Sequence, residues 1–341
     1  MIRRFRLILA ASIVLLSACS ESPSDPTRRL PDEPGRILYV AEEAAWTRQR
    51  LLIATSGGSH PDTITESLGR QVYFDWSAAN NLIAYTSSSQ SGIQIIRSDG
   101  SSVRVLVEHL ESSEIRYLQW SPDGTRLLYH IGDGIFVLPA QGGTPLRIAG
   151  NTDWYASPAW SPDGREVAFS RQGPAPEFRY ELWIARADGS RERRVALPMS
   201  VLHPRWSPDG RRIAFDNSQV FVVNADGSGL QVLAGDCAPS QACGSAALVE
   251  YPQWSPDGGK IAAIQSGSVV LIDVSTKRST TVPVGGAVNP APRWSLDGSR
   301  VAFVGHTPDG RMDIFTASRE GDDIVRITTS PYDDDIPLWV R

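Results

Sequence analysis

A tryptophan followed by a form of the tetrapeptide Ser-Pro-Asp-Gly recurs along this chain, and this repeat constrains the fold more than any other feature. The tryptophans that mark it are Trp76, Trp120, Trp160, Trp206, Trp254, Trp294 and, two residues from the C-terminus, Trp339. They are 40 to 48 residues apart, and a period of roughly 40 to 50 residues is typical of one four-stranded blade of a β-propeller. The repeat therefore predicts an all-β chain built from similar blades.

One repeat contains the signals for four strands and for the turns between them, and the copy that starts at Trp206 shows them most completely. Pro208 presets its own φ and Gly210 permits a positive φ, so the segment 207–210 predicts a tight turn. A continuous apolar run follows at 213–215, as expected for a strand that is covered on both faces. Residues 220–223 and 230–233 predict the third and fourth strands, with a turn at Asp226-Gly227 between them.

The two ends of the chain supply complementary parts of one blade. Residues 36–40, 51–54 and 63–68 predict a second, a third and a weak fourth strand, whereas 337–340 predicts a first strand with nothing after it. Pairing the C-terminal strand with these N-terminal strands closes the ring and removes two exposed sheet edges. We therefore predict a seven-bladed β-propeller of four-stranded antiparallel blades over residues 35–341, with a six-bladed ring as the alternative.

These repeats resemble the PD40 repeat, the Trp-Ser-Pro-Asp-Gly unit of the TolB family and of the propellers in tricorn-type and dipeptidyl-peptidase-type proteases. The resemblance extends over about residues 35–341 and implies a WD40-like β-propeller. The TolB family adds an α/β domain ahead of a six-bladed ring, and this sequence departs from both features. For function, the resemblance implies a protein or peptide partner in the periplasm.

The N-terminus has the organisation of a bacterial lipoprotein signal and is excluded from the fold. Basic Arg3, Arg4 and Arg6 precede an apolar segment, 7–16, and Leu16-Ser17-Ala18-Cys19 resembles a lipobox. The resemblance implies that a signal peptide, 1–18, is removed and that Cys19 is acylated, which anchors the mature chain in a membrane.

The segment that follows the lipobox predicts how the propeller is held. Residues 19–34 are rich in Ser, Pro, Asp and Glu and predict a flexible tether after the lipidated cysteine. Ser20, in place of Asp, favours the outer membrane over the inner membrane, with the protein facing the periplasm. The alternative is an ordinary signal peptide in which Cys19 is incidental.

The other two cysteines are Cys237 and Cys243, in an insertion rich in Gly, Ser and Ala between two predicted blades. In an exported protein, a pair with this spacing predicts a disulfide. A metal site would need further ligands nearby. We expect the disulfide to fix a loop rather than to react.

Motifs and charge favour a binding protein over an enzyme. The sequence has no Gly-x-Ser-x-Gly elbow for a serine nucleophile, and its five histidines show no zinc spacing such as His-Glu-x-x-His. The net charge is −5, and no basic run resembles a surface that follows phosphates. We therefore expect a monomer with a periplasmic or envelope protein or peptide as partner, no nucleic-acid partner, no cofactor and no metal. The alternative is a saccharide-binding or saccharide-cleaving propeller similar to oligogalacturonate lyases, which convergence of His109, His306 and the carboxylates of 333–335 would favour.

The repeat separates the two faces of the predicted ring. The Ser-Pro-Asp-Gly and Asp-Gly turns share one face, the turn face, because both connect strands that end on the same side. The opposite face, the loop face, receives the loops between second and third strands and the loops between blades, which vary in length. Binding residues concentrate on variable loops over a rigid scaffold, and aromatic and arginine side chains are enriched at hot spots. The loop-face candidates are Trp46, Arg48, Trp154, Tyr155, Phe178, Arg179, Tyr180, Asp333, Asp334 and Asp335.

Each of these candidates could instead have a purely structural role or face solvent. Each aromatic side chain could pack against a neighbouring loop instead of a partner. Asp333, Asp334 and Asp335 precede the last predicted inner strand, and such a run forms a solvated acidic patch more often than a calcium or magnesium site.

A second set of candidates lines the central channel. The residue before each repeat tryptophan points away from it by strand alternation, so these residues could face water in the channel and contact a ligand. The positions are Asp75, Gln119, Ala159, Arg205, Gln253, Arg293 and Leu338, and the five polar ones are the candidates. The alternative is that they merely hydrogen-bond to one another around a wet hole.

Overall fold

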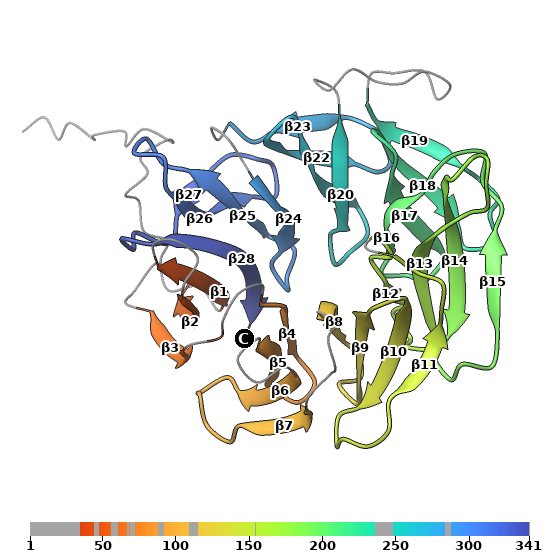
Figure 1. Ribbon diagram of the computed structural model, residues 1–341. Coiled ribbons are helices and arrows are strands. Elements are labelled where there is room, and N and C mark those ends of the chain that lie inside the picture. The colour runs from red at the N-terminus through yellow and green to blue at the C-terminus, as the bar shows by residue number, and fades with distance from the viewer. Residues whose placement is uncertain are drawn as a thin grey trace, which may run out of the picture.

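The computed structural model describes residues 35–43, 48–55, 61–66, 68, 72–87, 92–108, 115–153, 155–235, 248–283 and 288–340. These residues form 28 strands, which make seven antiparallel sheets of four strands each. Figure 1 shows the sheets arranged as blades around a central axis. The predicted all-β, seven-bladed architecture is confirmed, and the six-bladed alternative is wrong.

Blade 1 joins the two ends of the described chain. It consists of β28 (Asp333–Val340), β1 (Arg36–Glu43), β2 (Arg48–Thr55) and β3 (Asp62–Thr65). Strand β28 pairs with β1 in antiparallel register, with Val340 opposite Arg36 and Leu338 opposite Leu38. The predicted closure of the ring is confirmed, and β28 is longer than predicted because 333–335 also pair with β1.

The other six blades follow in chain order, each with its first strand nearest the axis (Figure 1). Blades 2 and 3 are β4 (Phe74–Ser77), β5 (Leu82–Ser87), β6 (Gly92–Arg97), β7 (Arg104–Val107), and β8 (Ile115–Trp120), β9 (Arg126–Ile131), β10 (Gly134–Pro139), β11 (Leu146–Ala149). Blades 4 and 5 are β12 (Ala159–Trp160), β13 (Glu166–Gln172), β14 (Tyr180–Arg186), β15 (Glu192–Val195), and β16 (Leu202–Trp206), β17 (Arg212–Asp216), β18 (Val220–Asn224), β19 (Gln231–Ala234). Blades 6 and 7 are β20 (Val249–Trp254), β21 (Lys260–Gln265), β22 (Ser268–Asp273), β23 (Ser279–Thr281), and β24 (Val288–Trp294), β25 (Arg300–His306), β26 (Met312–Ser318), β27 (Val325–Arg326).

The Ser-Pro-Asp-Gly segments fold into one repeated turn. In the copy at 207–210, the Ser207 hydroxyl donates to Asp209 Oδ1 at 2.5 Å and accepts the N–H of Arg212 at 3.0 Å. Gly210 has a φ of 68°, and its N–H donates to the Ser207 carbonyl at 2.9 Å. The bond from Ser207 lowers the pKa of Asp209. Four further copies contain the same serine-to-aspartate bond, so the turn face is a repeated, hydrogen-bonded framework.

The apolar second strands explain how the blades stack. In β17, the side chains of Ile213, Ala214 and Phe215 are fully buried. Ile213 and Phe215 pack with Trp206 against blade 4, whereas Ala214 points the other way and packs against blade 6. Because each second strand is covered by a neighbour on both faces, its run of apolar residues is continuous rather than alternating.

Candidate binding site

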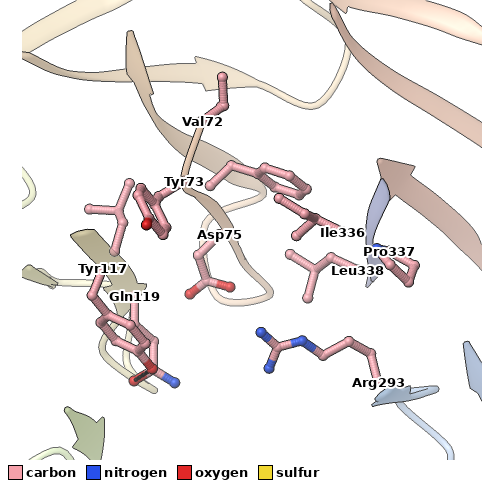
Figure 2. Close-up of a pocket in the computed structure, with 11 residues that line it drawn as sticks. Val72, Tyr73, Asp75, Tyr117, Gln119, Arg293, Ile336, Pro337 and Leu338 are labelled. Atoms are coloured by element: carbon pink, nitrogen blue, oxygen red, sulfur yellow. Dashed lines mark hydrogen bonds between the residues drawn. The ribbon is translucent and has the colours of Figure 1, made fainter. Parts of the chain in front are cut away.

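The residues that precede the repeat tryptophans surround the central channel. Asp75 of β4, Gln119 of β8 and Arg293 of β24 line a cavity of about 90 Å³, together with Tyr117 and Leu338. Figure 2 shows the Asp75 carboxylate and the Arg293 guanidinium facing each other across this cavity. The structure therefore brings together three of the five predicted channel residues around one space.

Asp75 links two blades through its carboxylate. The backbone N–H of Trp120, in blade 3, donates to Asp75 Oδ2 at 2.7 Å. Burial raises the pKa of Asp75 to about 6, and the Trp120 bond and the positive charge of Arg293 oppose this only in part. Gln119 repeats the arrangement one blade further on, because its Oε1 accepts the N–H of Trp160 at 3.3 Å.

Arg293 of blade 7 is joined to Gln253 of blade 6 through their side chains. The guanidinium Nη1 of Arg293 donates to Gln253 Oε1 at 3.5 Å. Burial and the positive charge of Arg205 lower the pKa of Arg293. The side-chain Nε2 of Gln253 is buried and has no acceptor among the described residues.

Arg205 is more fully engaged than Arg293. Its Nη1 donates to the carbonyls of Pro204 at 2.9 Å and Ser157 at 3.2 Å, and its guanidinium lies 6.0 Å from the ring centre of Tyr117. These contacts connect blade 5 to blades 3 and 4 within the channel. The candidate Arg205 therefore has a clear packing role, whereas the guanidinium of Arg293 lines the cavity.

The sequence reasoning missed the residue three positions before each repeat tryptophan. Ser157, His203, Tyr251 and Ile336 hold left-handed backbone conformations there, with φ between 40° and 59°. Non-glycine residues adopt this region at a cost on the order of 1–3 kcal/mol, and such residues cluster at binding sites. The register of β16 and of β20 shifts at this point. The recurrence of aromatic rings at this position, in Tyr73, Tyr117, His203 and Tyr251, was the available signal.

His203 and Asp216 form a pair that fixes this irregular backbone in blades 5 and 6. His203 Nδ1 lies 2.9 Å from Asp216 Oδ1, and the same carboxylate accepts the N–H of Tyr251 at 3.2 Å. The rings of His203 and Tyr251 are 4.1 Å apart. Asp216 is fully buried, which raises its pKa.

Two of the loop-face candidates are strongly exposed on blade 4. Tyr155 is 53% exposed and Phe178 is 58% exposed. The ring of Tyr180 lies edge-on to that of Tyr155 at 5.3 Å, and the Tyr180 hydroxyl donates to Asp153 Oδ2 at 2.7 Å. The loop that leads from blade 3 into blade 4 is thereby joined to the start of β14.

Among the remaining aromatic and arginine candidates of this loop group, Arg179 is the one whose side chain is described. Arg179 Nε lies 3.3 Å from Glu177 Oε2 in a surface ion pair. Trp46 and Trp154 lie outside the described residues, and so does the side chain of Arg48.

The aspartate run 333–335 belongs to β28, and its middle member is buried. Asp334 is fully buried and accepts bonds from the Ser330 hydroxyl at 2.9 and 3.0 Å; burial raises its pKa to about 7. Asp333 accepts the N–H of Met312 at 2.9 Å. Burial also raises the pKa of Asp335 to about 6. The expectation of a solvated acidic patch is wrong for Asp334, because pairing with β1 draws the run into the interface between blades 1 and 7.

Several other predictions concern metals, membranes and cysteines. In the described ranges no three His, Cys, Asp or Glu side chains are arranged to hold a metal ion, and His109 lies outside these ranges. Cys19, Cys237 and Cys243 also lie outside them. No helix in the part of the chain that the structure describes is long and apolar enough to cross a membrane.

Comparison with known proteins agrees with this architecture. A family model for the WD40 domain of anaphase-promoting complex subunit 4 matches residues 74–143. TolB from Acinetobacter baumannii is similar over 91% of this chain and 68% of its own chain, with 18% identity and a TM-score of 0.55. The comparison with curated proteins gave no match.

Two groups of enzymes have similar propellers. A puromycin-hydrolyzing peptidase of Mycobacterium tuberculosis is similar over 90% of this chain, with 17% identity and a TM-score of 0.63, but this chain covers only 55% of the peptidase. An oligogalacturonate lyase from Vibrio parahaemolyticus is similar over 85% of this chain and 92% of its own, with 12% identity and a TM-score of 0.62. At these identities the similarities show a shared WD40-like β-propeller fold, resembling the propellers of TolB, peptidases and lyases.

Proposed function

We propose that this protein is a binding scaffold of the bacterial cell envelope, which captures a protein or peptide with its loop face and channel mouth. The observation that carries the proposal is the exposure of Tyr155, on the loop between blades 3 and 4, and of Phe178, on the loop between β13 and β14. Among the large apolar side chains of the described residues that are strongly exposed, these two are the aromatic ones. Aromatic side chains are enriched at the hot spots of binding interfaces.

The fold supports this role by separating stability from recognition. Repeated hydrogen-bonded turns and buried apolar strands hold the ring, which leaves the loops of the opposite face able to vary in length and side chain. The Tyr180 hydroxyl is hydrogen-bonded to Asp153, and its ring packs edge-on against the exposed ring of Tyr155 and holds it in place. A partner therefore meets a surface that is already ordered, which reduces the entropy lost on binding.

The cellular location of the protein is part of the proposal and is argued from the sequence. Acylated Cys19 anchors a tether, 19–34, which holds the propeller on the periplasmic side of a membrane, with the outer membrane favoured. Cys237 and Cys243 form a disulfide in that oxidising compartment. The protein works as a monomer, without a cofactor.

The experiment that tests the proposal is affinity capture from an envelope extract of the source organism, with the full chain immobilised in mild detergent. The test variant combines Tyr155→Ala and Phe178→Ala. The matched control is Leu296→Ala, since Leu296 is 48% exposed but lies in a repeated turn on the opposite face. Thermal unfolding of all three forms should agree closely, because exposed side chains contribute little to stability.

The outcomes separate the candidate functions. A protein retained by the wild type and by Leu296→Ala, but not by the double variant, supports a loop-face binding scaffold. Equal retention by all three forms contradicts it. Retention of an acidic oligosaccharide in place of any protein would favour the competing proposal, a saccharide-binding or saccharide-cleaving propeller.

A further inference from the structure

Hydrogen-bond donors exceed acceptors on one side of the channel. The guanidinium of Arg293 carries five N–H donors, and the described residues give it one long bond, 3.5 Å to Gln253 Oε1. No described carboxylate forms an ion pair with it. The neighbouring Gln253 Nε2 is buried without an acceptor. A buried donor without a partner, such as Gln253 Nε2, is destabilising, and the donors of Arg293 that face the cavity can be satisfied by a bound acceptor.

Asp75 does not supply that acceptor. It lies on the opposite wall of the cavity (Figure 2), and its carboxylate is held by the backbone N–H groups of Trp120 and Trp76. The bond from Trp120 connects blades 2 and 3, and together the two bonds keep Asp75 in place. Apart from its bond to Gln253, the guanidinium of Arg293 therefore has donors that face the cavity and are available to a bound acceptor.

We propose that the cavity between Arg293 and Asp75 is a subsite for a single carboxylate group of a peptide ligand. The Arg293 guanidinium binds the carboxylate through paired N–H donors, while Gln253 Oε1 accepts from its Nη1 and helps to hold it in place. Arginine suits this role because its planar donors match the two oxygens of a carboxylate. This inference rests on the proposed binding function and names the chemical group that its channel recognises.

The shape of the cavity favours an acidic side chain or a chain end over a sugar acid. Its volume of about 90 Å³ is small, and Leu338, Ile336 and Val72 contribute apolar walls beside the polar groups. The methylene groups of a glutamate side chain fit such walls. The ring of a uronic acid carries several hydroxyl groups, and each one that lies against these apolar walls loses its hydrogen bonds to water without gaining a partner.

The two walls of the cavity carry opposite charges, so replacing one or the other should change the affinity for a carboxylate in opposite directions. Asp75 repels a bound carboxylate, whereas Arg293 attracts it. Replacing Asp75 with Asn keeps an acceptor for the Trp120 N–H and removes the repulsion. Replacing Arg293 with Gln removes the attraction and keeps a polar side chain in the channel.

The test uses three pools of acetylated hexapeptides with randomised flanking positions. One pool has a central Glu and an amidated C-terminus, the second has Gln in place of Glu, and the third has Gln and a free C-terminal carboxylate. Binding to the full chain is measured by affinity-selection mass spectrometry, with digalacturonate as a competitor. The variants are Arg293→Gln and Asp75→Asn, and the control is Arg165→Gln, whose side chain is 84% exposed on the turn face. Thermal unfolding is recorded for each form.

The expected result is that a carboxylate-bearing pool, Glu or free C-terminus, is enriched at least about tenfold over the amidated Gln pool. Arg293→Gln abolishes this preference, Arg165→Gln keeps it, and Asp75→Asn increases it about threefold or more, since a like charge has been removed. Comparing the two carboxylate pools tells whether a side chain or a chain end is bound.

Three outcomes would overturn the inference. They are equal binding of the carboxylate and amide pools, a preference that survives Arg293→Gln in a folded variant, and binding of digalacturonate alone. A protein captured through Tyr155 and Phe178 in spite of these outcomes would leave the scaffold function standing. Loss of that capture while the carboxylate preference remains would instead contradict the loop-face proposal and keep the channel subsite.

Discussion

The indole Nε1 of Trp254 donates a hydrogen bond to the backbone carbonyl of Arg205, 3.1 Å away in the preceding blade. The same bond joins Trp294 to Gln253 at 3.0 Å and Trp339 to Arg293 at 3.1 Å. The repeat tryptophan therefore connects each of these blades to the backbone of a channel residue. Stability of the ring and the position of the channel side chains are coupled through these bonds.

The first prediction compares two tryptophans that differ in this bond. Trp160 and Trp254 both lie under an arginine, at 4.9 and 5.0 Å from Arg126 and Arg212, but Trp160 Nε1 has no partner among the described residues. Trp254→Phe should therefore cost about 1 kcal/mol more of unfolding free energy than Trp160→Phe, the typical contribution of one hydrogen bond. Urea denaturation of both variants measures the difference. Equal losses would show that the bond across blades contributes nothing.

Much of the architecture can be predicted from the sequence because each repeat contains residue types that specify its turns and strands locally. The turn at 207–210 needs a serine hydroxyl, a proline φ and a glycine at positive φ, and each requirement is visible as a residue type. The closing strand could be predicted because the strands of Val340 and Arg36 each belonged to an incomplete blade, and their pairing removes two unpaired sheet edges.

The site was harder to predict because it depends on contacts between distant segments. The sequence indicated that Asp75 and Arg293 face the channel, but it could not show that the two face each other or that Gln253 lacks an acceptor. Asp334 looked solvated because its neighbours are charged. Its burial results from a lengthened strand pairing, which composition does not reveal.

A second prediction concerns the membrane anchor, which rests on the lipobox Leu16-Ser17-Ala18-Cys19. Cys19→Ala should abolish acylation, because the thiol that receives the lipid is missing. The protein should then move from the membrane fraction, and the intact mass should lose the acyl chains. Ser20→Ala serves as the control, since it leaves the cysteine in place. An unchanged membrane fraction with no acyl mass in the wild type would refute the lipoprotein assignment.

A third prediction concerns acid, and it follows from the repeated turns. The hydroxyl of Ser255 is the main cause that lowers the pKa of Asp257 to about 2, and Arg319 adds to it. A carboxyl whose pKa is lower in the folded state contributes stability above its unfolded pKa of about 4 and loses it as the pH falls toward 2. Asp257→Asn should weaken the fall in urea midpoint between pH 4 and pH 2.5, whereas Glu66→Gln, an exposed change, should leave it intact. A fall of the same size in Asp257→Asn would contradict this account.

The last prediction concerns a carboxyl group whose pKa is raised rather than lowered in the folded protein, at the interface between blades 1 and 7. Burial, and then the charges of Asp313 and Asp333, raise the pKa of Asp334 to about 7, although bonds from Thr328 and Ser330 favour the charged form. A carboxyl whose pKa is higher in the folded state binds its proton more tightly there. Its contribution to stability is therefore present below the unfolded pKa of about 4 and is lost as the pH rises through 7.

Asp334→Asn should remove this loss because the amide stays neutral and still accepts a bond from Ser330. We expect a Tm at pH 8 that is about 2 °C or more above that of the wild type, which corresponds to on the order of 1 kcal/mol in a domain of this size. At pH 4 the two Tm values should nearly agree. Asp62→Asn, an exposed change in the same blade, is the control and should follow the wild type at both pH values. If Asp334→Asn instead lowers the Tm equally at pH 4 and pH 8, the carboxylate acts through hydrogen bonds alone, and the closing strand does not respond to protonation.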